Sequence, residues 1–472
     1  EDSAENSSSN LTSLNDSNPK LKKEKSNLNM FSNKKLELRI TRNLTEDKAD
    51  PIENIKRTCK SMLDISKSME TEIQKRISKE VNQGKVDKSR RKPETIYKED
   101  NNNQDDDLPE GREFIDFGHE KFDLVFNIML GIKRSIDCMF DSPFSKLRDY
   151  DYHAKYEYKN EWFSANEDST NVFIFNDFAP KIFEDIRIKD GVSNDLYIEA
   201  LGPNNIYNYI WTNDFKSFTT LVSSGKSGSL FYYSMDGKFM LKTIARDEFY
   251  KLLDTLQVYH DHLLKYPDSL LTRYYGLHKI KYEEGGKNRE QYIIIMNNMF
   301  RKFTPDIKFD LKGSIHGRTT TFKDGKVDYK IAFKDNDFTE NKRIVGLKFG
   351  DKENLLKIVK SDSNYLGQNL TLDYSLLLGI IDLEKLKAES DNDPLLEYLK
   401  GDKKIDERGI YISEDEKELY VIGIIDTLTN YTNKKKLEYF YKRCKHGHNM
   451  SCIPPPLYAN RFYDFMEEKV FK

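Results

Sequence analysis

The first 110 residues of this 472-residue chain offer almost no side chains from which a hydrophobic core can be built. They hold two aromatic residues, Phe31 and Tyr97, whereas aromatic residues make up 12% of the whole chain. Serine, asparagine, lysine and glutamate are abundant, and the segment ends in the polar run 98–107. A chain of this composition buries too little apolar surface to offset its conformational entropy. Residues 1–110 are therefore predicted to be a disordered polar tail, and the folded domain is expected within 111–472.

One stretch of the tail has apolar residues at helical spacing, with lysine and arginine filling much of the remainder. These apolar residues are Ile55, Cys59, Met62, Met69, Ile73 and Ile77. The pattern fits a basic amphipathic helix that meets a membrane or a partner. It also fits a transient helix without a role, so both interpretations stay open.

Charge and cysteine content exclude several classes of protein. The net charge of −3 provides no overall field that would attract nucleic acid. Four cysteines spread over this length do not form a disulfide framework, which fits a reducing compartment. No apolar run approaches the roughly 20 residues that a membrane span needs. We therefore expect a cytosolic protein that meets membranes only at their surface and does not bind nucleic acid.

From residue 111 onward, apolar periodicity predicts a succession of helices and strands. Helices are predicted over 122–136, from Pro180 onward, over 246–265 and after the prolines 454–456. Strands are predicted on both sides of a turn at 236–237, over 292–300 and over 418–426. Residues 383–418 are charged and low in aromatic residues, so they are predicted to form a low-order insertion.

A glycine- and serine-rich stretch, Ser224-Gly225-Lys226-Ser227-Gly228, leads into the predicted hairpin. Backbone N–H groups in such a loop can cradle phosphates, although the stretch is not a Walker A motif because residue 220 is Thr.

Lys242 lies inside the second, apolar strand of this hairpin, where a charge is costly unless it is paired. We expect Lys242 to reach nucleotide phosphates. Glu248, at the start of the next helix, is its expected partner. The alternative is an edge-strand lysine whose ammonium group reaches solvent.

The nine residues from Asp310 to Arg318 concentrate an acid, two bases and two glycines. Glycine lets a backbone approach a ligand closely, while Lys312 and Arg318 are suited to phosphate. Asp310 can take a metal or orient a base. An isolated stretch of this kind is more often a solvated turn. The flanking phosphate-handling stretches favour a functional site here.

Two further acids lie at the ends of apolar segments. Asp373 precedes the run 374–380, and Asp426 ends the predicted strand 418–426. An acid at a strand end beside a phosphate site commonly holds Mg²⁺. The alternative is that each acid caps a following helix.

The segment 427–452 carries six lysine and arginine residues and one acid, Glu438, which gives a local charge of +5 in a chain of net charge −3. Interleaved aromatic residues fit docking on an anionic membrane surface, where each base contributes about 1 kcal/mol. The alternative is an ordinary solvated loop. The same segment offers four zinc-type ligands, but their spacing matches no usual zinc motif, so a zinc site is not predicted. These ligands are Cys444, His446, His448 and Cys452.

Taken together, residues from about 115 to 470 resemble the phosphatidylinositol phosphate kinase family. The stretches that carry the resemblance occur in the family's order. They are Ser224–Ser229, the strand around Lys242, Met296-Asn297-Asn298, Asp310–Ser314 with Arg318, Asp373–Gly379, Ile422–Asp426 and Tyr458–Phe462.

The resemblance implies an α+β fold with two kinase-like lobes, in which antiparallel sheets are flanked by helices. The lobes are expected at about 111–300 and 301–472, with 427–452 as the activation or specificity loop. The implied cofactors are ATP and Mg²⁺. The stretch 224–228, Lys242 and Met296-Asn297-Asn298 are expected to bind the nucleotide.

The resemblance also assigns chemistry to the acids and bases. Asp373 is expected to orient or deprotonate the attacking hydroxyl, with Lys242 and Asp310 as further catalytic residues, and Asp426 to bind Mg²⁺. Lys312 and Arg318 are expected to meet phosphate of the lipid headgroup. No His-Arg-Asp motif of protein kinases is present.

The expected subtype within this family depends on the basic segment 427–452. The run Lys434, Lys435, Lys436 and Glu438 is similar to the version in enzymes that phosphorylate the 5-position of phosphatidylinositol 4-phosphate. We therefore expect a 5-kinase on the cytoplasmic face of a membrane, with the plasma membrane as the expected site. A 4-kinase acting on the 5-phosphate isomer, a weakly catalytic phosphoinositide-binding scaffold and a homodimer stay open. One departure from the family is Asn336, where an apolar residue is expected.

Overall fold

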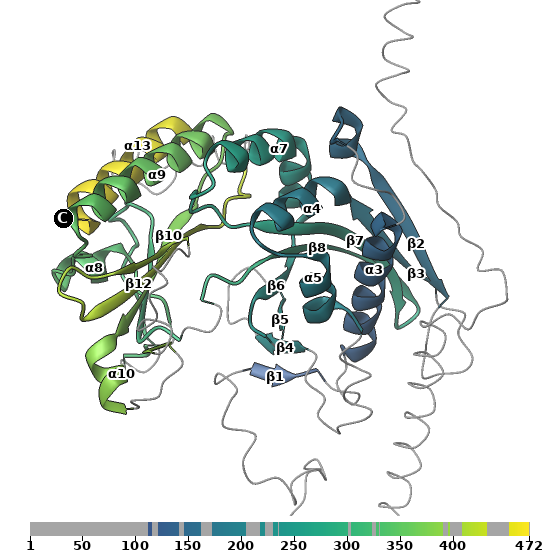
Figure 1. Ribbon diagram of the computed structural model, residues 1–472, viewed down its shortest axis with the longest axis horizontal. Coiled ribbons are helices and arrows are strands. Elements are labelled where there is room, and N and C mark those ends of the chain that lie inside the picture. The colour runs from purple at the N-terminus through teal and green to yellow at the C-terminus, as the bar shows by residue number, and fades with distance from the viewer. Residues whose placement is uncertain are drawn as a thin grey trace, which may run out of the picture.

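The structure is a computed structural model, and it describes thirteen stretches of the chain (Figure 1). These are residues 112–115, 121–140, 146–161, 172–203, 218–221, 230–234, 236–300, 304–322, 327–329, 331–389, 395–396, 408–431 and 453–471. The predicted disordered tail and most of the segment 427–452 lie outside the described residues. Among the described helices, none combines the length and apolar character needed to cross a bilayer.

The larger of two antiparallel sheets has eight strands in the order β1-β4-β5-β6-β8-β7-β3-β2. The strands are β1 (Arg112–Phe114), β2 (Lys155–Glu161), β3 (Val172–Phe178), β4 (Phe218–Leu221), β5 (Phe231–Ser234), β6 (Phe239–Ile244), β7 (Tyr274–Glu284) and β8 (Lys287–Asn297). The turn predicted at 236–237 joins β5 to β6, and Gly237 there has a φ of 67°, which favours glycine. The predicted hairpin is therefore confirmed.

Helices cover this sheet, as Figure 1 shows for α3, α4 and α5. They are α3 (Phe122–Phe140), η2 (Asp149–His153), α4 (Pro180–Lys189), α5 (Asn194–Leu201) and α7 (Arg246–Lys265). The predicted helical stripe of α3 is buried against the sheet, and α4 begins at Pro180 as expected. Glu248 caps α7, because its Oε2 accepts a hydrogen bond of 2.8 Å from the backbone N–H of Ala245.

The smaller sheet has the order β11-β12-β10-β9. Its strands are β9 (Ile307–Leu311), β10 (Ser375–Asp382), β11 (Ile410–Ile412) and β12 (Glu418–Ile425). The accompanying helices are α8 (Asp335–Glu340), α9 (Phe349–Gln368), α10 (Leu383–Glu389), α13 (Pro455–Phe465) and the π-helical turn η4 (Met466–Val470). Helices α9 and α13 lie side by side (Figure 1), with Gly367 of α9 close to Ala459 of α13. The predicted α+β class is confirmed, and the expected lobe boundary near residue 300 falls between β8 and β9.

The prediction of low order for 383–418 is wrong where the structure describes that segment. Residues Leu383–Glu389 form α10, and Ile410–Ile412 form an edge strand paired with β12. The reason is a small apolar cluster of its own, in which Leu383 and Ile410 pack with Ile381 and Leu419. A few well-placed aliphatic residues are enough to order a segment that is mostly charged.

A short connection ties the two sheets together. The segment before β7 pairs with β12, because Leu271 forms a parallel bridge with Ile424. The N–H of Thr272 donates to the carbonyl of Ile424 at 3.0 Å, and the N–H of Ile424 donates to the carbonyl of Leu270 at 2.8 Å. The two sheets are therefore hydrogen-bonded to each other at residues 270–272, and a cleft lies between them.

Candidate active site

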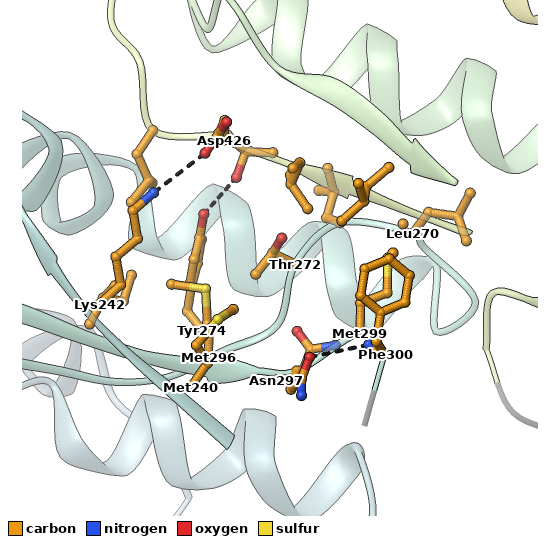
Figure 2. A pocket seen from close by; sticks show the side chains of 18 of the residues that line it. Met240, Lys242, Leu270, Thr272, Tyr274, Met296, Asn297, Met299, Phe300 and Asp426 are labelled. Atoms are coloured by element: carbon orange, nitrogen blue, oxygen red, sulfur yellow. Dashed lines mark hydrogen bonds and ion pairs between the residues drawn. The ribbon is translucent and has the colours of Figure 1, made fainter. Parts of the chain in front are cut away.

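The cleft between the sheets is a cavity of about 320 Å³ (Figure 2). Its walls are mostly apolar and come from both sheets. The larger sheet contributes Phe231, Tyr233, Met240, Lys242, Ile244, Tyr274, Ile294 and Met296, and the smaller sheet contributes Leu377, Ile410, Ile422, Gly423 and Ile425. Apolar walls with a few placed polar groups are typical of small-molecule sites.

Lys242 and Asp426 bring opposite charges together in the lining of this cleft. The Nζ of Lys242 lies 3.4 Å from Oδ1 of Asp426, and the two side chains are 19% and 47% exposed. The ammonium group also lies 5.4 Å from the centre of the Phe231 ring, in a cation–π contact. The expected pairing of Lys242 with Glu248 is wrong, since Glu248 caps α7 and Asp426 is the partner. The Asp426 carboxylate remains accessible for a further ligand.

The segment Met296-Asn297-Asn298 lines the cleft where β8 ends. The N–H of Asn297 donates to the carbonyl of Arg273, and that of Asn298 donates to the carbonyl of Lys238. The side chain of Asn298 is also engaged, through a 2.8 Å hydrogen bond to the carbonyl of Gly237. These donors fix the end of β8 to neighbouring segments of the larger sheet, so any contact to a nucleotide base must come from other atoms of 296–298.

Strand register brings the predicted acids and bases to one edge of the smaller sheet. Ser375 of β10 pairs with Ile425 of β12, and Leu376 pairs with Leu311 of β9. Asp373 before β10, Asp426 after β12 and Lys312 after β9 therefore share an edge. Contact is direct in one case, because Nζ of Lys312 donates to the backbone carbonyl of Asp373 at 2.7 Å.

Both edge aspartates have left-handed backbone conformations. The φ angles are 60° at Asp373 and 59° at Asp426. Non-glycine residues adopt this region at a cost, and such residues cluster at functional sites. Asp373 leads into β10 and Asp426 into a turn, so the alternative that each caps a helix is wrong.

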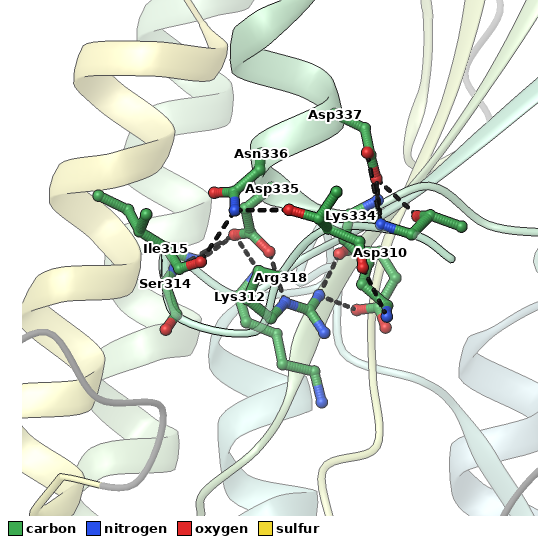
Figure 3. A network of polar contacts seen from close by, with 12 residues as sticks. Asp310, Lys312, Ser314, Ile315, Arg318, Lys334, Asp335, Asn336 and Asp337 are labelled. Atoms are coloured by element: carbon green, nitrogen blue, oxygen red, sulfur yellow. Dashed lines mark hydrogen bonds and ion pairs between the residues drawn. The ribbon is translucent and has the colours of Figure 1, made fainter. Parts of the chain in front are cut away.

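The loop 311–318 is organised by Asp335, the first residue of α8 (Figure 3). The Oδ1 of Asp335 accepts hydrogen bonds from three backbone N–H groups, those of Lys312 at 2.8 Å, Gly313 at 2.7 Å and Ser314 at 3.3 Å. Its Oδ2 accepts from Nε of Arg318 at 2.6 Å. Asp335 is fully buried, so its charge is offset by these donors.

Arg318, expected at the lipid headgroup, is held inside the protein. Its side chain is 11% exposed, and besides Asp335 it contacts both the carbonyl and the carboxylate of Asp310. The charges of the two aspartates outweigh burial and raise the pKa of the guanidinium. The headgroup contact of Arg318 stays a prediction, and the contacts seen here are structural.

Gly313 was expected to let a ligand approach, but it faces helix α13. A Cβ at this position would lie 3.0 Å from the carbonyl oxygen of Arg461, and the φ of 65° also favours glycine. Asn336, the departure from the family pattern, has a clear role in the same loop. Its Nδ2 donates to the carbonyl of Ile315 and to Oγ1 of Thr319, both at 2.9 Å.

Several predicted site residues lie outside the described part of the chain. They are Ser224, Gly225, Lys226, Ser227, Gly228, Lys434, Lys435, Lys436 and Glu438, together with the four zinc-type ligands of 444–452. In the stretches that are described, no group of three or more histidine, cysteine or acidic side chains could hold a metal by itself. Asp426 fits Mg²⁺ in another way, because this ion is often bound through one or two carboxylates and the phosphates of a nucleotide.

Sequence reasoning missed three residues around the site. Tyr274 looks like an ordinary core residue of a strand, yet its hydroxyl reaches the cleft lining. Arg408 lines the cleft while binding Asp190 of the larger-sheet half. The sequence position of Asp335 does not reveal that it binds a loop 17–23 residues away.

Comparison with known proteins agrees with this architecture. The family model described as phosphatidylinositol-4-phosphate 5-kinase matches residues 213–469, more than half of the chain. A phosphatidylinositol 4-phosphate 5-kinase of Plasmodium falciparum is 36% identical over 372 residues, covering 74% of this chain and 21% of that protein.

Two further relatives are named as kinases of different specificity. Phosphatidylinositol 4-phosphate 5-kinase 1 of Arabidopsis thaliana is 30% identical over 415 residues, covering 74% of this chain and 52% of that protein. Phosphatidylinositol 5-phosphate 4-kinase type-2 gamma of Xenopus tropicalis is 27% identical over 385 residues, covering 73% and 87%. The chain thus spans from a fifth to about half of the two 5-kinases. Because the family model matches over half of its length, the chain belongs to the phosphatidylinositol-4-phosphate 5-kinase family.

Proposed function

We propose that this protein is a lipid kinase that transfers the γ-phosphoryl group of ATP to the 5-hydroxyl of phosphatidylinositol 4-phosphate. The products are ADP and phosphatidylinositol 4,5-bisphosphate. One observation carries the proposal: Lys242 and Asp426 face each other across 3.4 Å in the lining of an apolar cleft. Asp373 lies on the strand edge beside them. Phosphoryl transfer needs positioning and charge neutralisation, and these residue types provide both.

The residues that line the cleft support the following arrangement of ATP. The base would lie between the apolar side chains of the two walls, among them Met240, Met296 and Ile422. The triphosphate would extend toward the ammonium group of Lys242. Mg²⁺, when bound with the nucleotide, neutralises the charge of the β- and γ-phosphate oxygens. Asp426 would hold this ion through its exposed carboxylate.

In this proposal, Asp373 acts on the lipid hydroxyl. The hydroxyl oxygen forms the new bond to the γ-phosphorus, the bond to the β–γ bridging oxygen breaks, and the hydroxyl proton passes to the Asp373 carboxylate. The side chain of Lys312 supports this role, because it holds the backbone carbonyl of Asp373. Rigid support of this kind keeps a base within reach of its substrate.

The 5-position and the membrane location rest on the sequence of the basic segment and on the names of relatives. Lys434, Lys435, Lys436 and Glu438 are similar to the 5-kinase version of the segment. Two of the relatives above are named 5-kinases, and one is named a 4-kinase of the isomeric lipid. We place the protein on the cytoplasmic face of an anionic membrane, docked by the lysine run.

A radiolabelled-ATP assay on vesicles containing each phosphatidylinositol monophosphate in turn tests the proposal. We expect preference for the 4-phosphate, with the label at ring position 5. Label at position 4 of the 5-phosphate isomer would overturn the regiospecificity while leaving the kinase chemistry in place. Vesicle binding without turnover on any isomer would overturn the kinase proposal in favour of a scaffold.

A further inference from the structure

A buried hydrogen bond joins the two walls of the cleft beside Asp426. The hydroxyl of Tyr274, at the start of β7, lies 2.7 Å from Oγ1 of Thr427, the residue that follows Asp426. Figure 2 shows this contact next to the pair Lys242–Asp426. Tyr274 and Thr427 are 3% and 7% exposed, so water does not compete for the bond. Tyr274 belongs to the larger sheet, whereas Thr427 lies two residues after the end of β12 in the smaller sheet.

The turn at Asp426 needs such support. A left-handed conformation is energetically unfavourable for an aspartate, and it persists only where the surroundings determine it. The contact of the carboxylate with Lys242 is long and partly exposed, so it fixes the side chain weakly. Further along the turn, the carbonyl of Thr429 accepts a hydrogen bond of 3.0 Å from the N–H of Leu372. On the C-terminal side of Asp426, the Thr427 side chain is therefore the nearest anchor among the described residues.

Tyr274 is itself rigidly held. Its backbone N–H donates to the hydroxyl of Tyr259 in α7 at 3.1 Å, and that hydroxyl donates to the carbonyl of Thr272 at 2.7 Å. Burial raises the pKa of the Tyr274 hydroxyl well above its ordinary value, so the group stays protonated. The hydroxyl is thus a fixed and neutral hydrogen-bonding group.

We infer that Tyr274 is a positioning residue whose hydroxyl, through Thr427, sets the carboxylate of Asp426 in place for the metal-bound nucleotide. The inference rests on the proposed function, which gives Asp426 its metal. Because the bond joins side chains of different sheets, it couples the separation of the cleft walls to the placement of the carboxylate. A contact behind a ligand typically changes metal affinity by ~10–100-fold when it is lost.

Tyr274→Phe removes only the hydroxyl, and Thr427→Val removes its partner at similar size. The readout is the rise in melting temperature caused by a non-hydrolysable ATP analogue, titrated with Mg²⁺. We expect each variant to need on the order of 10-fold more Mg²⁺ for half of the full rise. The double variant should need no more Mg²⁺ than either single variant, because the two substitutions remove the same hydrogen bond. In the vesicle assay, kcat should fall while KM for the lipid stays unchanged.

Two control variants make the test specific. Thr427→Ser keeps the hydroxyl and should match the parent protein. Tyr292→Phe makes the same change in the same sheet, but that hydroxyl binds Glu290 and does not line the cleft. It should leave the Mg²⁺ midpoint unchanged.

Unchanged Mg²⁺ midpoints in both Tyr274→Phe and Thr427→Val would overturn the inference, even if both variants melt at lower temperature. Additive effects in the double variant would also overturn it, since the residues would then act independently. If the parent protein gains no Mg²⁺-dependent stability from the nucleotide analogue, the proposed function fails. The two kinds of failure are therefore distinguishable.

Discussion

The cleft and the loop 311–318 contain similar charged residues, but they use them differently. In the cleft, the carboxylate of Asp426 is about half exposed and, among the residues that the structure describes, has one long contact, to Lys242. In the loop, Asp335 is buried, and its two oxygens accept from three backbone N–H groups and one guanidinium. The first carboxylate has room for a ligand, whereas the second has its hydrogen-bonding capacity filled by the protein.

This difference teaches that residue type and spacing alone do not mark a site. The stretch from Asp310 to Arg318 has the denser motif, yet many of its polar groups bind one another or Asp335. Lys242 and Asp426 are far apart in sequence and meet only through the fold. Only the structure shows which charged side chains already have their hydrogen bonds filled by the protein. It therefore separates carboxylates with a structural role, such as Asp335, from those that can still bind a ligand, such as Asp426.

The largest expected effect is on stability, from Asp335→Asn. An amide has a single acceptor oxygen and no charge, so it cannot accept all four hydrogen bonds. Arg318 would lose its closer carboxylate partner and keep the 3.4 Å contact with the carboxylate of Asp310. The free energy of unfolding should fall by about 3–5 kcal/mol, measured by urea denaturation. Glu340→Gln, at an exposed position of the same helix α8, is the control and should change it by less than about 0.5 kcal/mol. A stable but inactive Asp335→Asn protein would make this network part of the site.

The next effect is on turnover, from Asp426→Asn. Losing the metal-holding charge should lower kcat by roughly 10²–10³-fold, because metal-assisted charge stabilisation supplies several kcal/mol. The melting temperature and vesicle binding should be nearly unchanged, since the side chain is half exposed and is not one of the lysines proposed to dock on the membrane. Glu416→Gln, an exposed residue just before the same strand, controls for loss of one negative charge. Full activity in Asp426→Asn would remove the metal assignment.

The smallest effect is expected from Arg318→Lys, which keeps the charge but cannot contact Asp310 and Asp335 with the same geometry. Stability should fall by about 1–3 kcal/mol. The KM for the lipid should stay the same in the fraction that remains folded. If the KM rises while urea denaturation is unaltered, then Arg318 contacts the headgroup as its motif suggests. The loop 311–318 would then be part of the substrate site.

Local patterns in the sequence predicted the elements well. Helix α7 and the hairpin β5–β6 follow from apolar periodicity and from a turn residue, so they are encoded by neighbouring residues. The ordered parts of 383–418 were missed, because their cluster includes Ile381 and Leu419 from the flanking strands. A segment stabilised by strands outside it does not show its own order in its composition.

The site was predictable only in part. Lys242 stood out because a lysine in an apolar strand needs a partner, but Glu248, the partner expected from the sequence, is not that partner. The left-handed conformations of Asp373 and Asp426 depend on the register of two strands. Tyr274 could not be distinguished from a core tyrosine, because its role depends on a threonine 153 residues away.

Hydrogen–deuterium exchange with and without Mg²⁺ and a non-hydrolysable ATP analogue tests the central contrast most directly. We predict slower exchange in peptides covering 296–300 and 424–428, where the nucleotide would cover the cleft lining. Exchange in the peptide covering 311–316 should be slow from the start and unchanged, because Lys312, Gly313 and Ser314 already donate to Asp335. Protection confined to 311–316, with none along the cleft, would contradict the account.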